Sequence, residues 1–382
     1  MSREITAIGS QLKPKRLSSL ELMRIVLMLL IVAHHSVVNS GVMELWDPST
    51  LHGKAVFLTL WGMWGKVCIN AFVMITGYFM CKSRLTWMKF VKLIFSVYFW
   101  TAGLCAALMA AGFMGGGEAF RTLLFPFTSI DASFAASFLV VYLMIPFLNA
   151  LLSALDRKRL QRLLFLLLGV SVACTTVFNS PTAFSEVRWY ATLYLLAAYI
   201  RLYPAKWFDD SVATRRAFLA CAALSVTTVA WGIADLRLTG AGNVWDPYFY
   251  VSDSGKVMAF LTGVACFLFF KNLKMPHIPA VNAVASTVWG VLLIHANSDA
   301  MRRWLWGTVL DIPGAYTTMN GQRFVVYMVL VMFGVFAACS AMEALRLRFV
   351  ERPLFAWIGK NQSEIECTVM NTVNKAKSRL SR

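Results

Sequence analysis

Charged residues are scarce in this chain. They make up only 14% of its 382 residues, whereas hydrophobic residues make up 58%. Soluble proteins carry about 25% charged and roughly 45–50% apolar residues. A soluble domain of this composition would have too few polar side chains to cover its surface. The shortage excludes a soluble enzyme, a disordered scaffold and a secreted disulfide framework, and it indicates a multi-pass membrane protein.

Acidic residues are also few: 19 Asp and Glu stand against 36 Lys and Arg, which gives a net charge of +17. In a soluble protein this excess would suggest nucleic acid as a partner. Here the basic residues lie in short clusters between apolar runs, so we interpret them as signals of membrane topology and expect no nucleic-acid partner. No two of the eight cysteines have the C-x-x-C spacing of a zinc or redox site, so we expect no metal site.

Apolar runs of about 20 residues, the length that a membrane-spanning helix needs, recur along the chain. We predict an all-α fold with ten such spans, in a membrane domain over residues 20–355 that lies between a cytoplasmic segment 1–19 and a basic cytoplasmic tail 356–382. The first run is too long for a signal-peptide core, so we expect it to remain as an anchor. The predicted spans are residues 20–38, 56–80, 90–114, 134–152, 160–178, 189–203, 216–234, 255–270, 284–301 and 324–344.

The positions of Lys and Arg predict the direction of these spans. With ten spans, 26 basic residues fall on the N-terminal side of the membrane and nine on the other side, while Arg24 lies inside the first span. Basic residues concentrate on the cytoplasmic side, so both termini are expected there. The sequence shows neither paired halves nor the Gly/Pro-interrupted helices that mark many transporters.

The first span holds the densest set of ionisable side chains. Such residues are costly inside a membrane, and each is a functional hypothesis by default. At 100° per residue, the 11 steps from Arg24 to His35 end only 20° past three full turns, so both side chains share one face about 16 Å apart along the axis. A long donor that enters from the cytoplasm could touch both. Alternatively, Arg24 could snorkel and pair with Glu21, and His34 or His35 could be hydrogen-bonded core residues.

The segment from Glu21 to His35 resembles the opening helix of the acyltransferase-3 family of integral membrane acyltransferases, which carries an arginine, ten residues and then a histidine. Further resemblances follow in order along residues 17–355. They are residues 72–79, similar to a family F-x-x-I-S-G-Y/F motif, residues 138–149, similar to its fourth helix, residues 288–295, similar to its Y-L-I-H, and residues 349–353, similar to its closing E-R-P.

The resemblance implies O-acyl transfer, usually of acetyl, from a CoA thioester to a hydroxyl of a cell-envelope carbohydrate. His35 would be the base, because histidine titrates near neutrality, or it would carry the acyl group transiently. Arg24 would bind the donor or stabilise negative charge, and His295 could complete the site. Acetyl-CoA would act as a co-substrate, with no permanently bound cofactor.

Two further pairs of charged residues are candidates. One departs from the family pattern, and the other fits a structural role. Where many members have Arg-x-x-Arg, this chain has Lys89 and Lys92, which could neutralise CoA phosphates or simply anchor the helix at the cytoplasmic face. Glu351 and Arg352 are expected to form a structural ion pair, with Pro353 ending the last helix.

The sequence thus predicts a multi-pass acyltransferase of the bacterial cytoplasmic membrane. Its partners would be a CoA thioester, a glycan or lipid-linked sugar acceptor and the lipid bilayer. The alternative is an exporter of polysaccharide or lipid-linked sugar without covalent chemistry. A third possibility is a relay that hands acyl groups to a separate extracytoplasmic enzyme.

Overall fold

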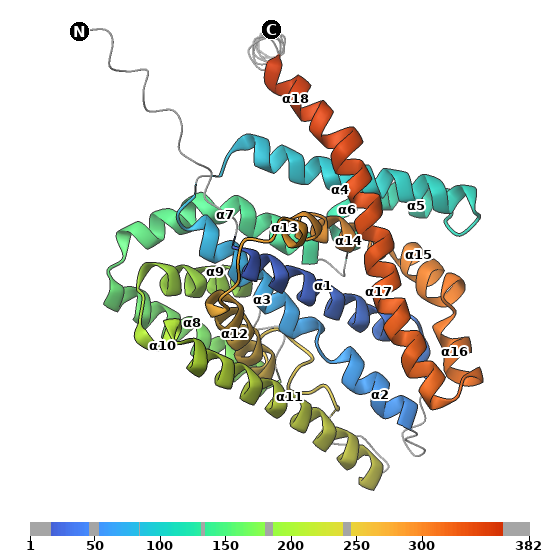
Figure 1. The fold of residues 1–382 in the computed structure, drawn as a ribbon, viewed down its shortest axis with the longest axis horizontal. Coiled ribbons are helices and arrows are strands. Elements are labelled where there is room, and N and C mark those ends of the chain that lie inside the picture. Colours follow the sequence, from blue (N-terminus) through green and yellow to red (C-terminus); the bar gives the residue numbers. More distant parts are fainter. Residues whose placement is uncertain are drawn as a thin grey trace, which may run out of the picture.

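The computed structural model describes residues 17–45, 53–83, 85–130, 134–179, 186–239 and 246–361. Throughout these ranges the regular structure is helical and no strand occurs. The predicted all-α membrane fold is therefore confirmed. Figure 1 shows the helices gathered into one bundle, with α11 along one edge and α17 and α18 crossing the opposite side.

The longer helices form the body of the bundle. They are α1 (Ser18–Val38), α2 (Gly53–Gly62) with α3 (Gly65–Met80), α4 (Trp87–Ala110), α7 (Phe134–Ala154), α8 (Arg157–Thr176), α9 (Glu186–Leu202), α11 (Ser211–Thr239), α12 (Val257–Asn272) and α17 (Gly321–Arg346). The shorter elements are η1 (Val42–Leu45), α5 (Gly116–Leu124), α6 (Pro126–Ser129), α10 (Lys206–Asp209), α13 (Pro279–Ala285), α14 (Val288–His295), α15 (Asp299–Arg302), α16 (Ile312–Thr318), α18 (Arg352–Lys360) and the π-helical segments η5 (Arg303–Val309) and η6 (Leu347–Glu351).

Among the described residues, seven helices are long and apolar enough to cross a membrane, and one bent pair could form an eighth span. Each of the ten predicted spans coincides with a helical segment. However, α9 has 17 residues and α12 has 16, fewer than the roughly 20 that cross a bilayer upright. The count of ten spans and the cytoplasmic position of the termini therefore stay predictions.

The predicted span 284–301 is not one continuous helix. α14 ends at His295, and the segments Pro279–His295 and Asp299–Thr318 meet at 96°. Asn297 and Ser298 bond the local backbone: the Asn297 amide donates to the Leu293 carbonyl, and the Ser298 hydroxyl caps α15. Side chains that bond backbone in this way compete with helix continuation. Neither Gly nor Pro occurs at the break, so their absence did not exclude it, and the expectation of one continuous helix over residues 284–301 is wrong.

The last helix does not end at Pro353. α17 passes through the π-helical segment η6 into α18, which runs to Lys360. Proline is tolerated in the first turn of a helix, where its missing N–H has no partner to lose. The π-turn places Pro353 in such a first turn, so the chain continues as a helix.

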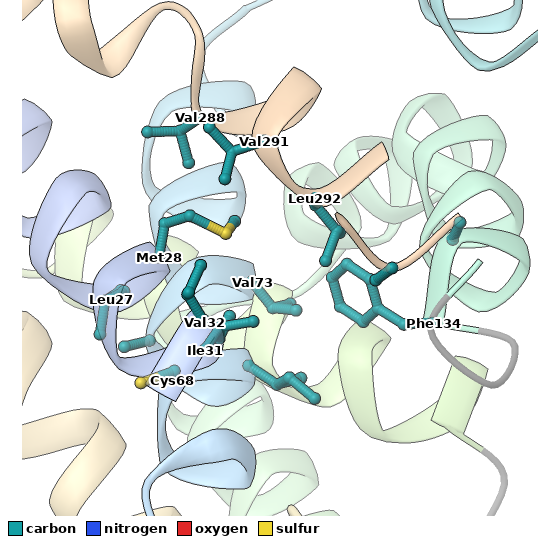
Figure 2. Close-up of a cluster of buried hydrophobic side chains, with 14 of the residues drawn as sticks. Leu27, Met28, Ile31, Val32, Cys68, Val73, Phe134, Val288, Val291 and Leu292 are labelled. Atoms are coloured by element: carbon teal, nitrogen blue, oxygen red, sulfur yellow. The ribbon is translucent and has the colours of Figure 1, made fainter. Parts of the chain in front are cut away.

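The helix α1 lies in the interior, in contact with α2, α3, α12, α13, α14 and α17. Figure 2 shows part of the core around it: Leu27, Met28, Ile31 and Val32 of α1 face Cys68 and Val73 of α3, Phe134 of α7, and Val288, Val291 and Leu292 of α14. This central position explains why the predicted face of α1 is buried in protein and is not turned to lipid.

Candidate active site

The predicted stripe on α1 faces a cavity of about 340 Å³, which we call the Arg24 cavity. Arg24, Met28 and Ile31 line it, as their shared face requires. The Arg24 guanidinium also pairs with Glu21 at 3.2 Å, which agrees with the alternative that this arginine has a local partner. The remaining lining residues are Ile69, Phe72, Ile75, Thr76, Leu93, Phe134, Phe138, Ala285, Ser286, Val288, Trp289 and Leu292.

His35 meets His295 at the far end of this stripe. His35 Nδ1 lies 3.0 Å from His295 Nε2, and both side chains are buried, with exposures of 4% and 0%. Each histidine follows a cavity-lining residue by one helical turn, His35 after Ile31 and His295 after Leu292. The structure therefore brings together two of the predicted catalytic residues just beyond the Arg24 cavity.

The hydrogen bonds assign the ring protons of this pair. His295 Nδ1 lies 2.5 Å from the Val291 carbonyl, which can only accept, so Nδ1 must carry a hydrogen. In a neutral ring His295 Nε2 is then an acceptor, and His35 Nδ1 donates to it. In the neutral pair the remaining lone pair is on His35 Nε2. The carbonyl and His295 thus select the tautomer of His35 that can take up a proton at Nε2.

His34 has a different role. Its Nδ1 lies 2.5 Å from the Gly62 carbonyl, at the turn between α2 and α3. A Cβ at Gly65 would collide with the His34 ring. His34 is therefore packed against the α2–α3 turn, as the core interpretation of this residue expects.

Several buried groups beside His295 were missed by the sequence reasoning. Asn297 is 1% exposed and donates to Thr101 Oγ1 at 3.3 Å as well as to the backbone. The Trp306 indole is fully buried and meets the His295 ring edge to face, with centroids 6.2 Å apart. Trp306 belongs to the π-helical segment η5, and π-turns often mark functional sites. The polar residues that follow His295 in an otherwise apolar stretch were the sequence signal that could have identified these groups.

An ion-pair network on α17 packs against α14. Arg346 binds both carboxylate oxygens of Glu343, at 2.8 and 2.7 Å, and also Glu351 at 2.7 Å. The Trp100 indole donates to Glu343 at 2.7 Å. A Cβ at Gly290 would collide with the Glu343 carboxylate, so α14 and α17 are in close contact there.

This network corrects the expected pairing of the closing motif. Glu351 pairs with Arg346 and not with Arg352, because Arg346 lies on the buried face of the helix and the π-turn brings Glu351 to it. Glu343 lies inside the predicted span 324–344, so the rule that flags ionisable residues in spans could have found it.

The predicted donor-binding lysines do not line the Arg24 cavity. Lys89 Nζ lies 3.4 Å from Ser83 Oγ, and Lys92 Nζ lies 5.0 Å from the centroid of the Phe355 ring. Leu93, the next residue on α4, does line the cavity. Both lysines are therefore at the end of α4 near the cavity, and their contact with a donor stays a prediction.

A second cavity, of about 750 Å³, lies at the other end of the bundle, and we call it the Arg302 cavity. Along α13 to α15 the order is Ser286 in the first cavity, His295, then Ser298 in the second. Along α4 and α5 the order is Leu93, then Gly117. The histidine pair is thus between two cavities. The Arg302 cavity is lined by Gly117, Glu118, Arg121, Thr122, Phe125, Thr128, Ser129, Ser298, Asp299, Arg302 and Arg303.

The sequence model of the acyltransferase-3 family, described as an acyltransferase domain, matches residues 17–360, which include every residue of both cavities and the histidine pair. No curated protein and no solved structure matches the chain. The match extends over nearly the whole helical bundle and ends with α18. This chain belongs to the acyltransferase-3 family and is a membrane acyltransferase.

Proposed function

We propose that this acyltransferase moves a short acyl group, acetyl in the simplest case, from a CoA thioester to a hydroxyl of a cell-envelope or exported polysaccharide. The observation that carries the proposal is the His35–His295 pair, held between two cavities at opposite ends of the bundle. A donor and an acceptor that enter from opposite sides would meet there.

The Arg24 cavity suits the donor. Arg24 lines it from the second turn of α1, and the distribution of basic residues assigns the start of α1 to the cytoplasm, where CoA thioesters are made. Its volume of about 340 Å³ is at the small end of ligand pockets, which suits the acyl-bearing arm of a thioester better than a whole CoA. Arg24 would bind a polar group of that arm, while Lys89 and Lys92 would face the phosphates outside. In this assignment the protein spans the bacterial cytoplasmic membrane.

The transfer follows from the tautomer of the pair. His35 Nε2 takes the proton of the acceptor hydroxyl. At the same time the oxygen of that hydroxyl bonds to the carbonyl carbon of the thioester. The carbon–sulfur bond then breaks, the acyl group stays on the acceptor oxygen as an ester, and the proton passes from His35 to the departing thiolate. The His295 ring, whose Nε2 accepts from His35 Nδ1, stabilises the positive charge that His35 holds in between.

The alternative role of His35 as a transient acyl carrier makes a different kinetic prediction. An acyl-imidazole would release CoA before any acceptor binds, and purified protein mixed with acetyl-CoA alone would show a burst of about one CoA per site. Direct transfer shows no such burst. Rapid-quench measurement of free CoA decides between the two.

The proposed function is tested with labelled acetyl-CoA and membranes that contain the wild-type protein, His35→Ala, or the control His277→Ala. His277 is an exposed histidine that bonds Asn282 away from the pair. We expect wild-type and control membranes to label an acceptor and His35→Ala to lose at least about 10²-fold in rate. Equal labelling by all three would contradict a catalytic His35.

A polysaccharide exporter is the second candidate function. The helical segments Pro279–His295 and Asp299–Thr318 form a broken helix after His295, and broken helices near a binding site are typical of transporters. The two functions differ in what a deletion strain displays. A surface glycan of normal amount without acetyl groups supports the transferase, whereas reduced glycan with normal acetylation supports the exporter. A relay to a separate extracytoplasmic enzyme would label that partner before the glycan.

A further inference from the structure

A third cavity, of about 680 Å³, lies between α4 and α17, and we call it the α4–α17 groove. Its lining is almost entirely apolar. The one hydroxyl, on Tyr327, is used in a hydrogen bond to the Leu310 carbonyl. The groove is lined by Leu104, Ala107, Leu108, Ala111, Ile294, Met301, Trp304, Leu305, Val309, Leu310, Tyr327, Leu330, Val331, Gly334, Val335, Ala338, Cys339 and Met342.

The groove opens on the outer surface of the bundle. Val309, Leu330 and Met342 at its edge are exposed by 53%, 64% and 41%. In a membrane such a surface faces lipid, so a hydrocarbon chain can enter the groove sideways from the bilayer. A Cβ at Gly334 would have nothing within 4 Å, which shows open space inside the groove at this position.

The groove and the Arg302 cavity are lined by consecutive parts of the same two stretches of chain. On one side, α4 lines the groove and the following α5 lines the Arg302 cavity. On the other side, one segment serves both: Met301, Trp304 and Leu305 face the groove, while Arg302 and Arg303 face the polar cavity. An apolar and a polar compartment therefore lie next to each other, divided by the alternating side chains of one segment.

His295, one member of the histidine pair, lies along the chain between a residue of the groove and a residue of the Arg302 cavity. Ile294 lines the groove, and Ser298 lines the Arg302 cavity. His295 stands between them in the chain and contacts His35. Neither histidine lines either compartment, so His295 follows the groove and precedes the polar cavity along the chain without forming a wall of either.

The side chains of the Arg302 cavity are suited to bind a hydroxylated headgroup. It holds both signs of charge, with Arg303 paired to Glu118 at 3.3 Å and Arg302 paired to Asp299. Arg121 adds a third cation, and the exposed Phe125 ring gives a flat apolar surface among hydroxyl groups. Charged and hydroxyl groups supply donors and acceptors for hydroxyls, and an aromatic face covers the apolar side of a sugar ring.

We propose that the acceptor is an amphiphile: a hydroxylated headgroup binds in the Arg302 cavity while a hydrocarbon chain lies in the α4–α17 groove. The inference rests on the proposed acyl transfer and names its substrate class as a membrane-anchored hydroxyl compound. The chain would hold the acceptor at a fixed depth, so that one hydroxyl is presented to His35.

The test fills the groove with a side chain. Gly334→Leu places an isobutyl group in the open space, and Gly169→Leu on α8 is the matched control, because Gly169 is also exposed with nothing within 4 Å of a Cβ. Membranes with each variant, the wild-type protein or His35→Ala receive a short pulse of labelled acetyl-CoA. Products are then divided into a chloroform/methanol phase and a water-soluble carbohydrate fraction.

We expect His35-dependent label in the organic phase, reduced roughly tenfold by Gly334→Leu and unchanged by Gly169→Leu, because a blocked groove costs the acceptor its chain contacts. Equilibrium binding of a non-hydrolysable CoA thioether to the purified variants checks the donor side and should equal wild type, because Gly334 does not line the Arg24 cavity.

The other outcomes overturn the inference in distinguishable ways. His35-dependent label found only in the water-soluble fraction would leave the proposed function standing and exclude an anchored acceptor. Organic-phase label that Gly334→Leu does not lower would mean that ordinary bilayer lipid fills the groove. No His35-dependent label in either fraction would overturn the proposed function and this inference together.

Discussion

His35 and His295 lie 260 positions apart in the chain, yet their rings share a hydrogen bond of 3.0 Å in the interior of the bundle. Because His295 Nδ1 is fixed on the Val291 carbonyl, the bond has a direction, and the neutral pair has its accepting nitrogen on His35. The two residues therefore have unequal roles, which mutation can separate.

Replacing His295 should impair chemistry without impairing donor binding. His295→Ala removes the acceptor for His35 Nδ1–H and the group that stabilises its charge, so we expect kcat to fall by roughly 10²- to 10⁴-fold. The KM for acetyl-CoA should change little, because His295 does not line the Arg24 cavity. Steady-state kinetics with membranes at varied acetyl-CoA tests this split. An increase in KM with kcat preserved would contradict the assignment.

Arg24 should show the opposite pattern. Arg24→Gln removes a charged donor from the cavity wall, and hydrogen bonds to charged groups contribute about 1.5–3 kcal/mol, so binding of the CoA thioester should weaken about 10- to 150-fold. Arg24→Lys should retain part of the affinity. Equilibrium binding of a non-hydrolysable CoA thioether to the purified protein measures the change. Unaltered affinity in Arg24→Gln would mean that the arginine only pairs with Glu21.

The α17 network should contribute strongly to stability. Arg346→Met leaves the buried Glu343 carboxylate without its cation, and breaking a buried ion pair from one side costs about 3–5 kcal/mol. Arg348→Met, two residues along and exposed, is the control. Unfolding on heating can be followed in detergent by the reaction of buried thiols such as Cys105 and Cys339 with a dye. Equal melting temperatures for the two variants would refute the role of the network.

Two glycines should respond differently to the same change to alanine. A Cβ at Gly77 would lie 2.6 Å from the Tyr194 carbonyl oxygen, so Gly77→Ala should force α3 and α9 apart at a cost of about 1–3 kcal/mol. Gly169→Ala meets nothing and should be neutral or slightly stabilising. The same thiol-reactivity melt compares them. A neutral Gly77→Ala would show that α3 and α9 are not packed as closely as described.

Some features of the site could be predicted from the chain alone because they are local. Helical periodicity decides that Arg24, Met28 and Ile31 share a face, and the structure shows all three along one cavity. The ordered motifs that resemble acyltransferase-3 members likewise lie in the sequence itself, and the family match over residues 17–360 confirms the family that they indicated.

The amino-acid sequence by itself determined that the chain forms apolar helices, since 58% hydrophobic residues in runs of about 20 leave a membrane-spanning helix as the structure that satisfies the backbone. Only the tertiary structure decided that His35 faces His295, that Glu351 pairs with Arg346, and that α14 breaks before Asn297. These features depend on which helices pack together and at what rotation. Hydrophobic periodicity sets the face of one helix but carries no information on its partner.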